Sequence, residues 1–448
     1  MHEQYGASEA EALIAALQND QPQTSIRVNP LKAKAPEQLV DVPCSPVPWC
    51  NDGFHLQERP SFTTNPLFHA GCFYVQEASS MFLTHALRHL PLPAPHPTVL
   101  DLCAAPGGKS LSALSALPDA LLVSNEINGK RASILCENIQ KWGWSNCVVT
   151  NNAPKDFQAF PETFDLIITD VPCSGEGMFQ KEEQAIEQWS MRFVEQTAAL
   201  QRSILQDIWT CLKPGGFLIY STCTFNHLED EQNVQFITEQ LGGRTIELPI
   251  NSDWNILPGA IPATYHFMPH RVNGYGFFLC TIQKDGEWLP SERKKGKKEG
   301  KSRANVGKQP LQLKDWLKNK NDFAFMANDK DQSISAIAEH DKAMVEALQK
   351  HLRVKSAGIP LAYEKKGKYI PHPALALSVQ LRQEAFPKCE LGLEDALTFL
   401  RAEALHLPEN TPKGYLLVTY QHVPLGFVNN IGTRANNLYP SEWRIRKC

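Results

Sequence analysis

Short, continuous apolar runs alternate with segments of helical periodicity between Thr98 and Lys284. Helix-length segments separate the first five runs, and the longest, Gln184 to Leu212, ends at the helix-stopping sequence KPGG. Buried strands that alternate with helices predict an α/β fold with a doubly wound, mostly parallel sheet covered on both faces. The predicted strands are TVLDLCA, ALLVSNE, NCVVTN, FDLIITD, GFLIYSTC and FFLCTIQ.

The residues before this core have shorter and more varied patterns. We expect an amphipathic helix over Glu9–Gln18, a strand in SIRVNPLK and a second helix from Gln76 to Leu90. The sequence PLPAPHP at residues 91–97 cannot continue a helix and indicates a boundary. We therefore predict a small N-terminal module over residues 1–92 and a core domain over residues 93–285.

The composition changes abruptly after the core, where a basic linker is predicted over residues 286–308. Within it, Arg293 to Lys308 carries eight Lys/Arg and one Glu, a net charge of +7 in a chain of formal net charge −4, so the remainder carries −11. Such a segment is either a solvated tether or a tether that also contacts phosphates. The nearly neutral total therefore does not exclude a nucleic-acid partner.

The C-terminal part divides into a region without a recognisable motif and a small β domain. Residues 309–390 form this intermediate region. Near the end, GYLLVTYQHVPLGFVNN has two β-rich runs separated by a His-Val-Pro turn, followed by the basic RANNLYPSEWRIRKC. This pattern predicts a β domain over residues 391–448.

Length and composition exclude several classes of protein. At roughly 150 residues per domain, 448 residues suggest two to four domains. The chain is 42% hydrophobic and 21% charged, which excludes wholesale disorder. Its apolar runs are shorter than the ~18–20 residues of a membrane span, and its acidic N-terminus lacks signal-peptide features. We therefore expect a cytoplasmic protein that has no membrane partner and whose cysteines are thiols.

Twelve cysteines need a separate explanation. They form no C-x-x-C pair, which argues against a zinc ribbon or a thioredoxin-type site, so no metal is predicted. Most are expected to be small buried hydrophobic residues. Cys173 and Cys223 differ because both follow the ends of predicted neighbouring strands, where ligands of open α/β sheets bind.

The motif DLCAAPGGKS, Asp101 to Ser110, predicts a strand, an Ala-Pro-Gly-Gly turn and a helix that begins near Lys109. Small residues let a ligand approach the backbone, and the helix N-terminus offers free N–H groups. Glu126 follows the next strand, where a carboxylate can accept both ribose hydroxyls. The chain lacks GxGxxG and a Walker box here, so S-adenosylmethionine is the favoured ligand. The alternative is a turn that serves tight packing alone.

Two further motifs carry the cysteines. In DVPCSGEGMF, Asp170 ends the fourth strand and Cys173 stands where amino-group methyltransferases have an aromatic residue. In STCTFNHLEDEQNV, Cys223 ends the fifth strand. A thiolate that adds to carbon 6 of a pyrimidine makes carbon 5 nucleophilic, and a hydrogen bond at N3 from Asp170 relieves the developing charge. A second cysteine could assist release of the product.

In this order, DLCAAPGGK, DVPCSGEG and STCT resemble the NSUN/RsmF family of RNA cytosine-C5 methyltransferases, from about Phe73 to Lys284. The resemblance implies a Rossmann-like, seven-stranded core. It also implies that Cys223 is the nucleophile, that Cys173 assists product release and that Asp170 contacts the base and the cofactor. The implied S-adenosylmethionine site comprises Cys103, Ala104, Ala105, Pro106, Gly107, Gly108, Lys109, Glu126 and Asp170.

The chain differs from the family at the position expected to contact the adenine of the cofactor. The family usually has an aspartate after the third strand, whereas this chain has VTNNAP. Asn152 is the candidate adenine contact, because an amide can both donate and accept there. Asp156, four residues on, is the alternative.

The flanking segments resemble the family as well. YVQEASSMF resembles the segment that closes the cofactor pocket, and RVNPLK the N-terminal RNA-binding module. YLLVTYQHVPLGFV with NNLYPSEWRIR resembles the terminal PUA-like RNA-binding domain of the bacterial RsmF-type enzymes. The implied substrate is a cytosine in 16S rRNA, free or in the small ribosomal subunit. The alternatives are a transfer RNA substrate, a non-catalytic ribosome-assembly factor, and a methyltransferase for amino groups or proteins.

Overall fold

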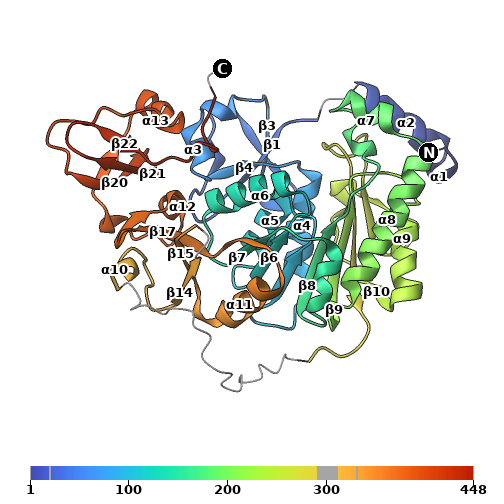
Figure 1. Ribbon diagram of the computed structural model, residues 1–448. Coiled ribbons are helices and arrows are strands. Elements are labelled where there is room, and N and C mark those ends of the chain that lie inside the picture. The colour runs from blue at the N-terminus through green and yellow to red at the C-terminus, as the bar shows by residue number, and fades with distance from the viewer. Residues whose placement is uncertain (1, 20–21, 290–310, 329–330, 447–448) are drawn as a thin grey trace.

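A ten-stranded mixed sheet forms the centre of the molecule (Figure 1). The computed structural model describes residues 2–19, 22–289, 311–328 and 331–446. The strands of this sheet are β5 (Thr98–Asp101), β6 (Leu121–Asn125), β7 (Cys147–Thr150), β8 (Phe164–Asp170), β9 (Leu212–Thr222), β10 (Gly243–Thr245), β11 (Leu257–Pro258), β12 (Thr264–Phe267), β13 (Phe277–Lys284) and β16 (Val354–Ala357). Their order is β11-β12-β13-β9-β8-β5-β6-β7-β16, and β10 pairs with the C-terminal end of β13.

The order and direction of these strands confirm the predicted Rossmann-like sheet. The neighbours β7, β6, β5, β8 and β9 are parallel, whereas β13 is antiparallel to β9. All six predicted strands are present as β5 to β9 and β13. The strand β12, which the sequence did not indicate, extends the sheet beyond β13.

Helices cover both faces of the sheet, which explains its continuous apolar strands. Neighbouring residues of one strand face opposite sides, so Val99 and Leu100 belong to different hydrophobic clusters. One face is covered by α4 (Phe82–His89), α5 (Gly108–Ala116) and α6 (Gly129–Trp142), and the other by α8 (Met191–Trp209), α9 (Glu231–Phe236) and α11 (Lys342–His351).

The intermediate region forms a second sheet and is joined to the core. Its strand order is β14 (Phe323–Asn328), β15 (Ser333–Ala338), β17 (Ile359–Lys365), β18 (Lys368–Pro371), and the region also contains α10 (Leu311–Lys314) and α12 (Pro373–Leu377). Between β15 and β17 in sequence, β16 leaves this sheet and pairs antiparallel with β7. The intermediate region therefore supplies one edge strand of the core sheet.

The two ends of the chain pack against each other through one hydrophobic cluster, which includes Ile26 and Leu67 from one end and Leu397 and Val418 from the other. The N-terminal elements are β1 (Ser25–Val28), β2 (Cys44–Val47), β3 (Cys50–Leu56), α3 (Pro66–His69) and β4 (Phe73–Val75). The C-terminal elements are β19 (Lys388–Glu390), α13 (Leu393–Leu400), β20 (Gly414–Tyr420), β21 (Val423–Asn430) and β22 (Ala435–Asn437). In Figure 1 this C-terminal domain lies at the end of the molecule opposite to α8 and α9.

Helices α1 (His2–Tyr5) and α2 (Ala7–Asn19) pack at the α8 end of the molecule (Figure 1). Leu13 on α2 contacts a small cluster with Phe225 and Met268. Glu9 on the same helix accepts hydrogen bonds from His270 Nε2 at 2.8 Å and Arg271 Nη2 at 2.6 Å. The helix predicted over Glu9–Gln18 is therefore present and covers the loop that follows β9.

Three predicted elements differ in detail from the structure. The helix expected over Gln184–Leu212 is two helices, α7 (Glu183–Gln188) and α8, because the Ser190 side chain caps a new helix by accepting the Phe193 N–H at 3.1 Å. KPGG lies within β9 rather than in a helix stop. The helix expected from Gln76 begins as a 3₁₀ turn at Ser79 and becomes α4 at Phe82.

The turn of the C-terminal hairpin begins one residue earlier than expected. Gln421 and His422 have positive φ values of 49° and 64°, which is the conformation of a two-residue hairpin turn. Val423 and Pro424, expected in the turn, are therefore the first residues of β21.

The basic linker and the expected lack of a membrane span concern longer segments of the chain. Of the basic linker predicted over residues 286–308, residues 290–308 lie outside the described residues. No helix within the described ranges has the length and apolar character of a membrane span.

Candidate active site

Cys173 and Cys223 lie at the carboxyl ends of adjacent parallel strands. Asp170 ends β8 opposite Ser221 of β9, so the loops that carry the two cysteines leave the sheet side by side. The Sγ atoms are 3.2 Å apart. The structure therefore brings together the thiols that the sequence places 50 residues apart.

The Cys173 thiol favours its protonated form. The hydrogen bond to Cys223 and burial raise the pKa of Cys173 well above its usual value. Cys173 therefore keeps its proton, and its thiol lies within hydrogen-bond distance of the Cys223 sulfur. A thiolate is the nucleophilic form of cysteine, and a neighbouring S–H donor stabilises it.

Asp170 and Lys109 form an ion pair beside the thiols, with Lys109 Nζ 2.7 Å from Asp170 Oδ2. Ser221 Oγ donates to Asp170 Oδ1 at 3.0 Å. Burial would lower the pKa of Lys109, but the charges of Asp170 and Cys223 outweigh it and the pKa is raised. The Lys109 ammonium is therefore charged.

The glycine-rich turn lies between β5 and α5. Arg131 Nη2 donates to Ala105 O at 2.7 Å, and Asn138 Nδ2 donates to Pro106 O at 2.8 Å. Gly107 has a φ of 126°, a backbone conformation that residues with a Cβ rarely adopt. These contacts fix the turn and direct the N-terminus of α5 toward the Asp170 end of β8.

The predicted pocket-closing segment packs directly on this turn. A Cβ on Gly108 would lie 3.5 Å from both the Tyr74 ring and the Gln76 carboxamide. Cys103 is half-buried, and Ala104 and Ala105 are buried. The motif and the predicted pocket-closing segment therefore lie at van der Waals distance, and the small residues of the motif suit a ligand.

Two acidic residues fit a ligand with hydroxyl or amino groups. Glu126 follows β6 and accepts the Asn128 N–H at 2.8 Å, with Arg131 Nη1 3.3 Å from its other oxygen. Asp101 Oδ1 is a buried acceptor without a hydrogen-bond partner among the described residues. Glu126 can accept ribose hydroxyls and Asp101 an amino group, which agrees with the groups of S-adenosylmethionine.

The candidates for the adenine contact have other partners in this structure. Asn152 Nδ2 donates to Arg353 O at 3.3 Å, and Asn152 Oδ1 accepts the Arg353 N–H at 3.0 Å. Asp156 Oδ2 accepts the Ala153 N–H at 2.9 Å and so caps a short helix. Both side chains stabilise the loop after β7, and adenine recognition by Asn152 stays a prediction.

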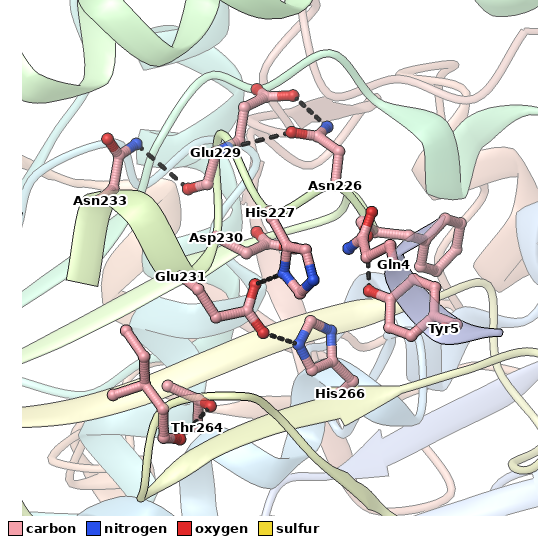
Figure 2. Close-up of polar contacts among 12 residues, drawn as sticks. Gln4, Tyr5, Asn226, His227, Glu229, Asp230, Glu231, Asn233, Thr264 and His266 are labelled. Carbon is pink, nitrogen blue, oxygen red and sulfur yellow. Dashed lines mark hydrogen bonds and ion pairs between the residues drawn. The ribbon is translucent and has the colours of Figure 1, made fainter. Parts of the chain in front are cut away.

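The loop after Cys223 is covered by the N-terminal helix. Gln4 Nε2 and Tyr5 Oη both donate to Phe225 O, at 2.6 and 2.5 Å. Figure 2 shows Tyr5 beside His227 and His266, which both bind the Glu231 carboxylate. No pattern in the sequence indicated that the first residues of the chain contact this loop.

The sequence also did not single out two buried glutamates, Glu176 and Glu229, that connect the loops of the two cysteines. Their positions shortly after each cysteine, in SGEG and HLEDE, were the available signal. The described part of the chain contains no group of three or more His, Cys, Asp or Glu side chains arranged to hold a metal ion.

Three family models together match most of the chain. They are the 16S rRNA methyltransferase RsmB/F model at residues 90–283, the N-terminal domain of 16S rRNA methyltransferase RsmF at residues 1–78, and the methyltransferase RsmF PUA domain at residues 386–445. These matches agree in order with the core and the two terminal domains of the fold.

Relatives match over nearly the full length. Ribosomal RNA small subunit methyltransferase F of Erwinia tasmaniensis is 30% identical, and the match covers 93% of this chain and 90% of the relative. The protein of the same name from Aliivibrio fischeri is 32% identical with the same coverage.

Solved structures share the core. A methyltransferase homologue from Pyrococcus horikoshii is 26% identical, with a TM-score of 0.52 over 63% of this chain and 92% of that one. NSun6 from the same organism, solved with SFG, has the same fold at 19% identity, with a TM-score of 0.56 over 64% and 97% of the two chains. The matching domains, the full-length relatives and the cofactor-type turn lead to one conclusion: this chain belongs to the RsmF family of S-adenosylmethionine-dependent methyltransferases.

Proposed function

We propose that this protein methylates carbon 5 of a cytosine in 16S rRNA through a covalent adduct between Cys223 and carbon 6. The observation that carries the proposal is the 3.2 Å distance between the Cys173 and Cys223 sulfurs beside the Lys109–Asp170 ion pair. A single buried thiol has no chemical role by default, whereas two facing thiols at strand ends fit a nucleophile and its proton partner.

Each residue has a defined part in this reaction. The Cys223 thiolate forms a bond to carbon 6, and the electrons of the C5–C6 double bond become available at carbon 5. The Asp170 side chain contacts the base at N3, and the charged Lys109 ammonium beside it offsets the negative charge that develops on the ring. S-adenosylmethionine supplies the methyl group that carbon 5 accepts.

Release of the product needs a second proton transfer. The carbon-5 proton leaves to a base, the double bond re-forms, and the Cys223 sulfur departs from carbon 6. The Cys173 sulfur lies 3.2 Å from the Cys223 sulfur, so the Cys173 thiol can hydrogen-bond the departing Cys223 thiolate, which regains its proton from solvent. This geometry supports the role of Cys173 in product release.

An RNA substrate is supported by the flanking domains. The family-model match at residues 386–445 is a PUA domain, and the relatives are named for the small ribosomal subunit RNA. The reacting cytosine must leave its stack to expose carbon 6 to Cys223. Flanking domains and the basic residues 293–308 would then supply affinity through phosphates.

The alternatives differ in what they leave unexplained. An amino-directed methyltransferase needs the same cofactor residues but has no role for Cys223. A non-catalytic assembly factor has no role for either thiol or for the Lys109–Asp170 pair. A transfer RNA substrate would use the same chemistry, so the two RNA classes are separated by experiment.

Bisulfite sequencing of total RNA from cells with and without the protein tests the proposal. We expect a cytosine in 16S rRNA that resists conversion only when the protein is present. Resistance confined to transfer RNA would establish the other substrate class. Methylation of an exocyclic nitrogen, detected by mass spectrometry of digested RNA, would overturn the carbon-5 proposal.

A further inference from the structure

Two buried glutamates connect the cysteine loops in a reciprocal way. Glu229 follows Cys223 in sequence but bonds the loop of Cys173, and Glu176 follows Cys173 but bonds the loop of Cys223. Their exposed fractions are 0% and 2%. Neither has a part in the chemistry proposed above, although burying a carboxylate is costly unless its oxygens are hydrogen-bonded.

Glu229 binds the residue next to Cys173. Its Oε1 accepts the Ser174 N–H at 2.8 Å and Gln201 Nε2 at 2.8 Å, and its Oε2 accepts Ser174 Oγ. Asn226 Nδ2 donates to Oε2 at 2.7 Å, a contact visible in Figure 2. Gln201 also donates to Pro172 O at 2.8 Å, on the other side of Cys173. These bonds fix the backbone before and after Cys173.

Glu176 binds the residues next to Cys223. Its Oε2 accepts the Phe225 N–H at 2.8 Å and Thr224 Oγ1 at 2.7 Å. Its Oε1 accepts Trp189 Nε1 at 3.1 Å. The carboxylate therefore fixes the two residues that follow Cys223.

The two loops also touch through their backbones. Gly177 N donates to Cys223 O at 2.9 Å. A Cβ on Gly177 would lie 3.0 Å from that oxygen and 2.9 Å from Tyr275 O, so the approach requires glycine. Both cysteine loops are thus held to each other independently of any substrate.

We infer that Glu229 and Glu176 are positioning residues that hold the two sulfurs in register, each by binding the loop of the other cysteine. This inference rests on the proposed function for its catalytic meaning. Glu229 fixes Cys173 and hence the release step, whereas Glu176 fixes Cys223 and hence the attack on carbon 6. Because misplacing a reacting group by about 1 Å can cost roughly 100-fold in rate, the two substitutions should affect different steps.

The experiment follows both steps in one turnover. Excess enzyme is mixed with S-adenosylmethionine and small-subunit rRNA from cells that lack the protein, and samples are quenched in detergent. A denaturing gel measures the protein–RNA adduct, and mass spectrometry measures 5-methylcytosine. We expect Glu229→Ala to slow adduct release, so that adduct accumulates, and Glu176→Ala to slow adduct formation, each roughly 10- to 100-fold.

Matched variants separate positioning from general damage. Glu195→Ala changes an exposed glutamate on α8 and should behave as wild type. Glu229→Gln and Glu176→Gln keep one carbonyl acceptor and should retain most of the rate. If an alanine variant fails to fold, the glutamine variant at the same position is compared with wild type instead. Alanine variants that fold and perform both steps at the wild-type rate would overturn the inference. Equal slowing of both steps, together with a lower melting temperature, would also overturn it.

A second readout does not depend on methylation. Phenylarsine oxide bridges two close thiols and releases one water, and Cys173→Ala defines the signal of this pair. Wild type should bind the reagent, and Glu229→Ala and Glu176→Ala should bind it roughly tenfold more weakly because the sulfurs separate. If wild type makes no 5-methylcytosine, the proposed function fails while this measurement still decides the inference. Unchanged reagent binding in both variants would then overturn it.

Discussion

Asn152 and Arg353 exchange two hydrogen bonds between the loop after β7 and the start of β16. The Asn152 carboxamide donates to the Arg353 carbonyl and accepts the Arg353 N–H, at 3.3 and 3.0 Å. Asn125 Nδ2 in turn donates to Asn152 O at 3.0 Å, next to Glu126. The intermediate region is therefore fastened to the part of the core that faces the predicted adenine.

Asn152→Ala should lower the stability of the protein more than it lowers the affinity for S-adenosylmethionine. The substitution leaves both Arg353 backbone groups without this partner, at a cost of about 1–2 kcal/mol. Thermal unfolding with and without S-adenosylmethionine measures the loss, and calorimetric titration measures affinity. A large loss of affinity with unchanged melting temperature would instead favour direct adenine recognition by Asn152.

Cys223→Ala should abolish methylation and keep cofactor binding. Removing the nucleophile of a covalent mechanism commonly costs at least roughly 10³-fold in rate. Transfer of labelled methyl groups to rRNA measures activity, and calorimetry confirms that S-adenosylmethionine still binds. Cys280→Ala is the matched control, because Cys280 is a buried thiol in β13 without a proposed role. Full activity of the Cys223 variant would contradict the mechanism.

Cys173→Ala should leave the attack intact and block release. The variant keeps the Cys223 sulfur but loses the Cys173 thiol that we propose stabilises this sulfur as it leaves carbon 6. The covalent intermediate should therefore persist. A slowly migrating protein–RNA band on a denaturing gel measures it, and the Cys173→Ala, Cys223→Ala double variant should lack the band. Normal turnover without the band would exclude the release role.

Stability should fall as the pH decreases from 6.5 to 4, partly because of His69. Burial and the Lys141 charge lower the pKa of His69 from 6.5 to about 4. Its Nε2 lies 2.9 Å from Thr63 O, and its Nδ1 is buried without a partner among the described residues. As the pH falls, His69 is protonated in the unfolded chain before it is protonated in the folded protein. The stabilisation that neutral His69 gives the folded state is therefore complete above pH 6.5 and is lost toward pH 4, by up to about 3 kcal/mol.

Melting temperatures measured between pH 7 and pH 4 check this expectation. His69→Gln should show a shallower decline with falling pH than wild type, because it removes one group whose pKa differs between the two states. His406→Gln, at an exposed position, is the control. A decline of equal steepness in all three proteins would exclude His69 as a source of the pH dependence.

Much of the core could be predicted because its signals are local. The apolar runs became β5 to β9 and β13, and Asp170, Cys173 and Cys223 lie at strand ends as predicted. The helix over Gln184–Leu212 was predicted too long because the Ser190 cap inside the periodic pattern went unrecognised. Reading KPGG as a helix stop had a similar cause, since β9 continues through it.

The sequence by itself determined the α/β core, the family, the cofactor turn and the pair of thiols. It did so because period, turn residues and motif spacing act over a few residues, and parallel strands bring their carboxyl ends to one edge. Only the tertiary structure decided that β16 completes the core sheet and that Asn152 binds Arg353. The same holds for the crossed contacts of Glu176 and Glu229. An edge strand or a buried carboxylate takes whichever complementary groups the fold brings to it, and local sequence does not specify those partners.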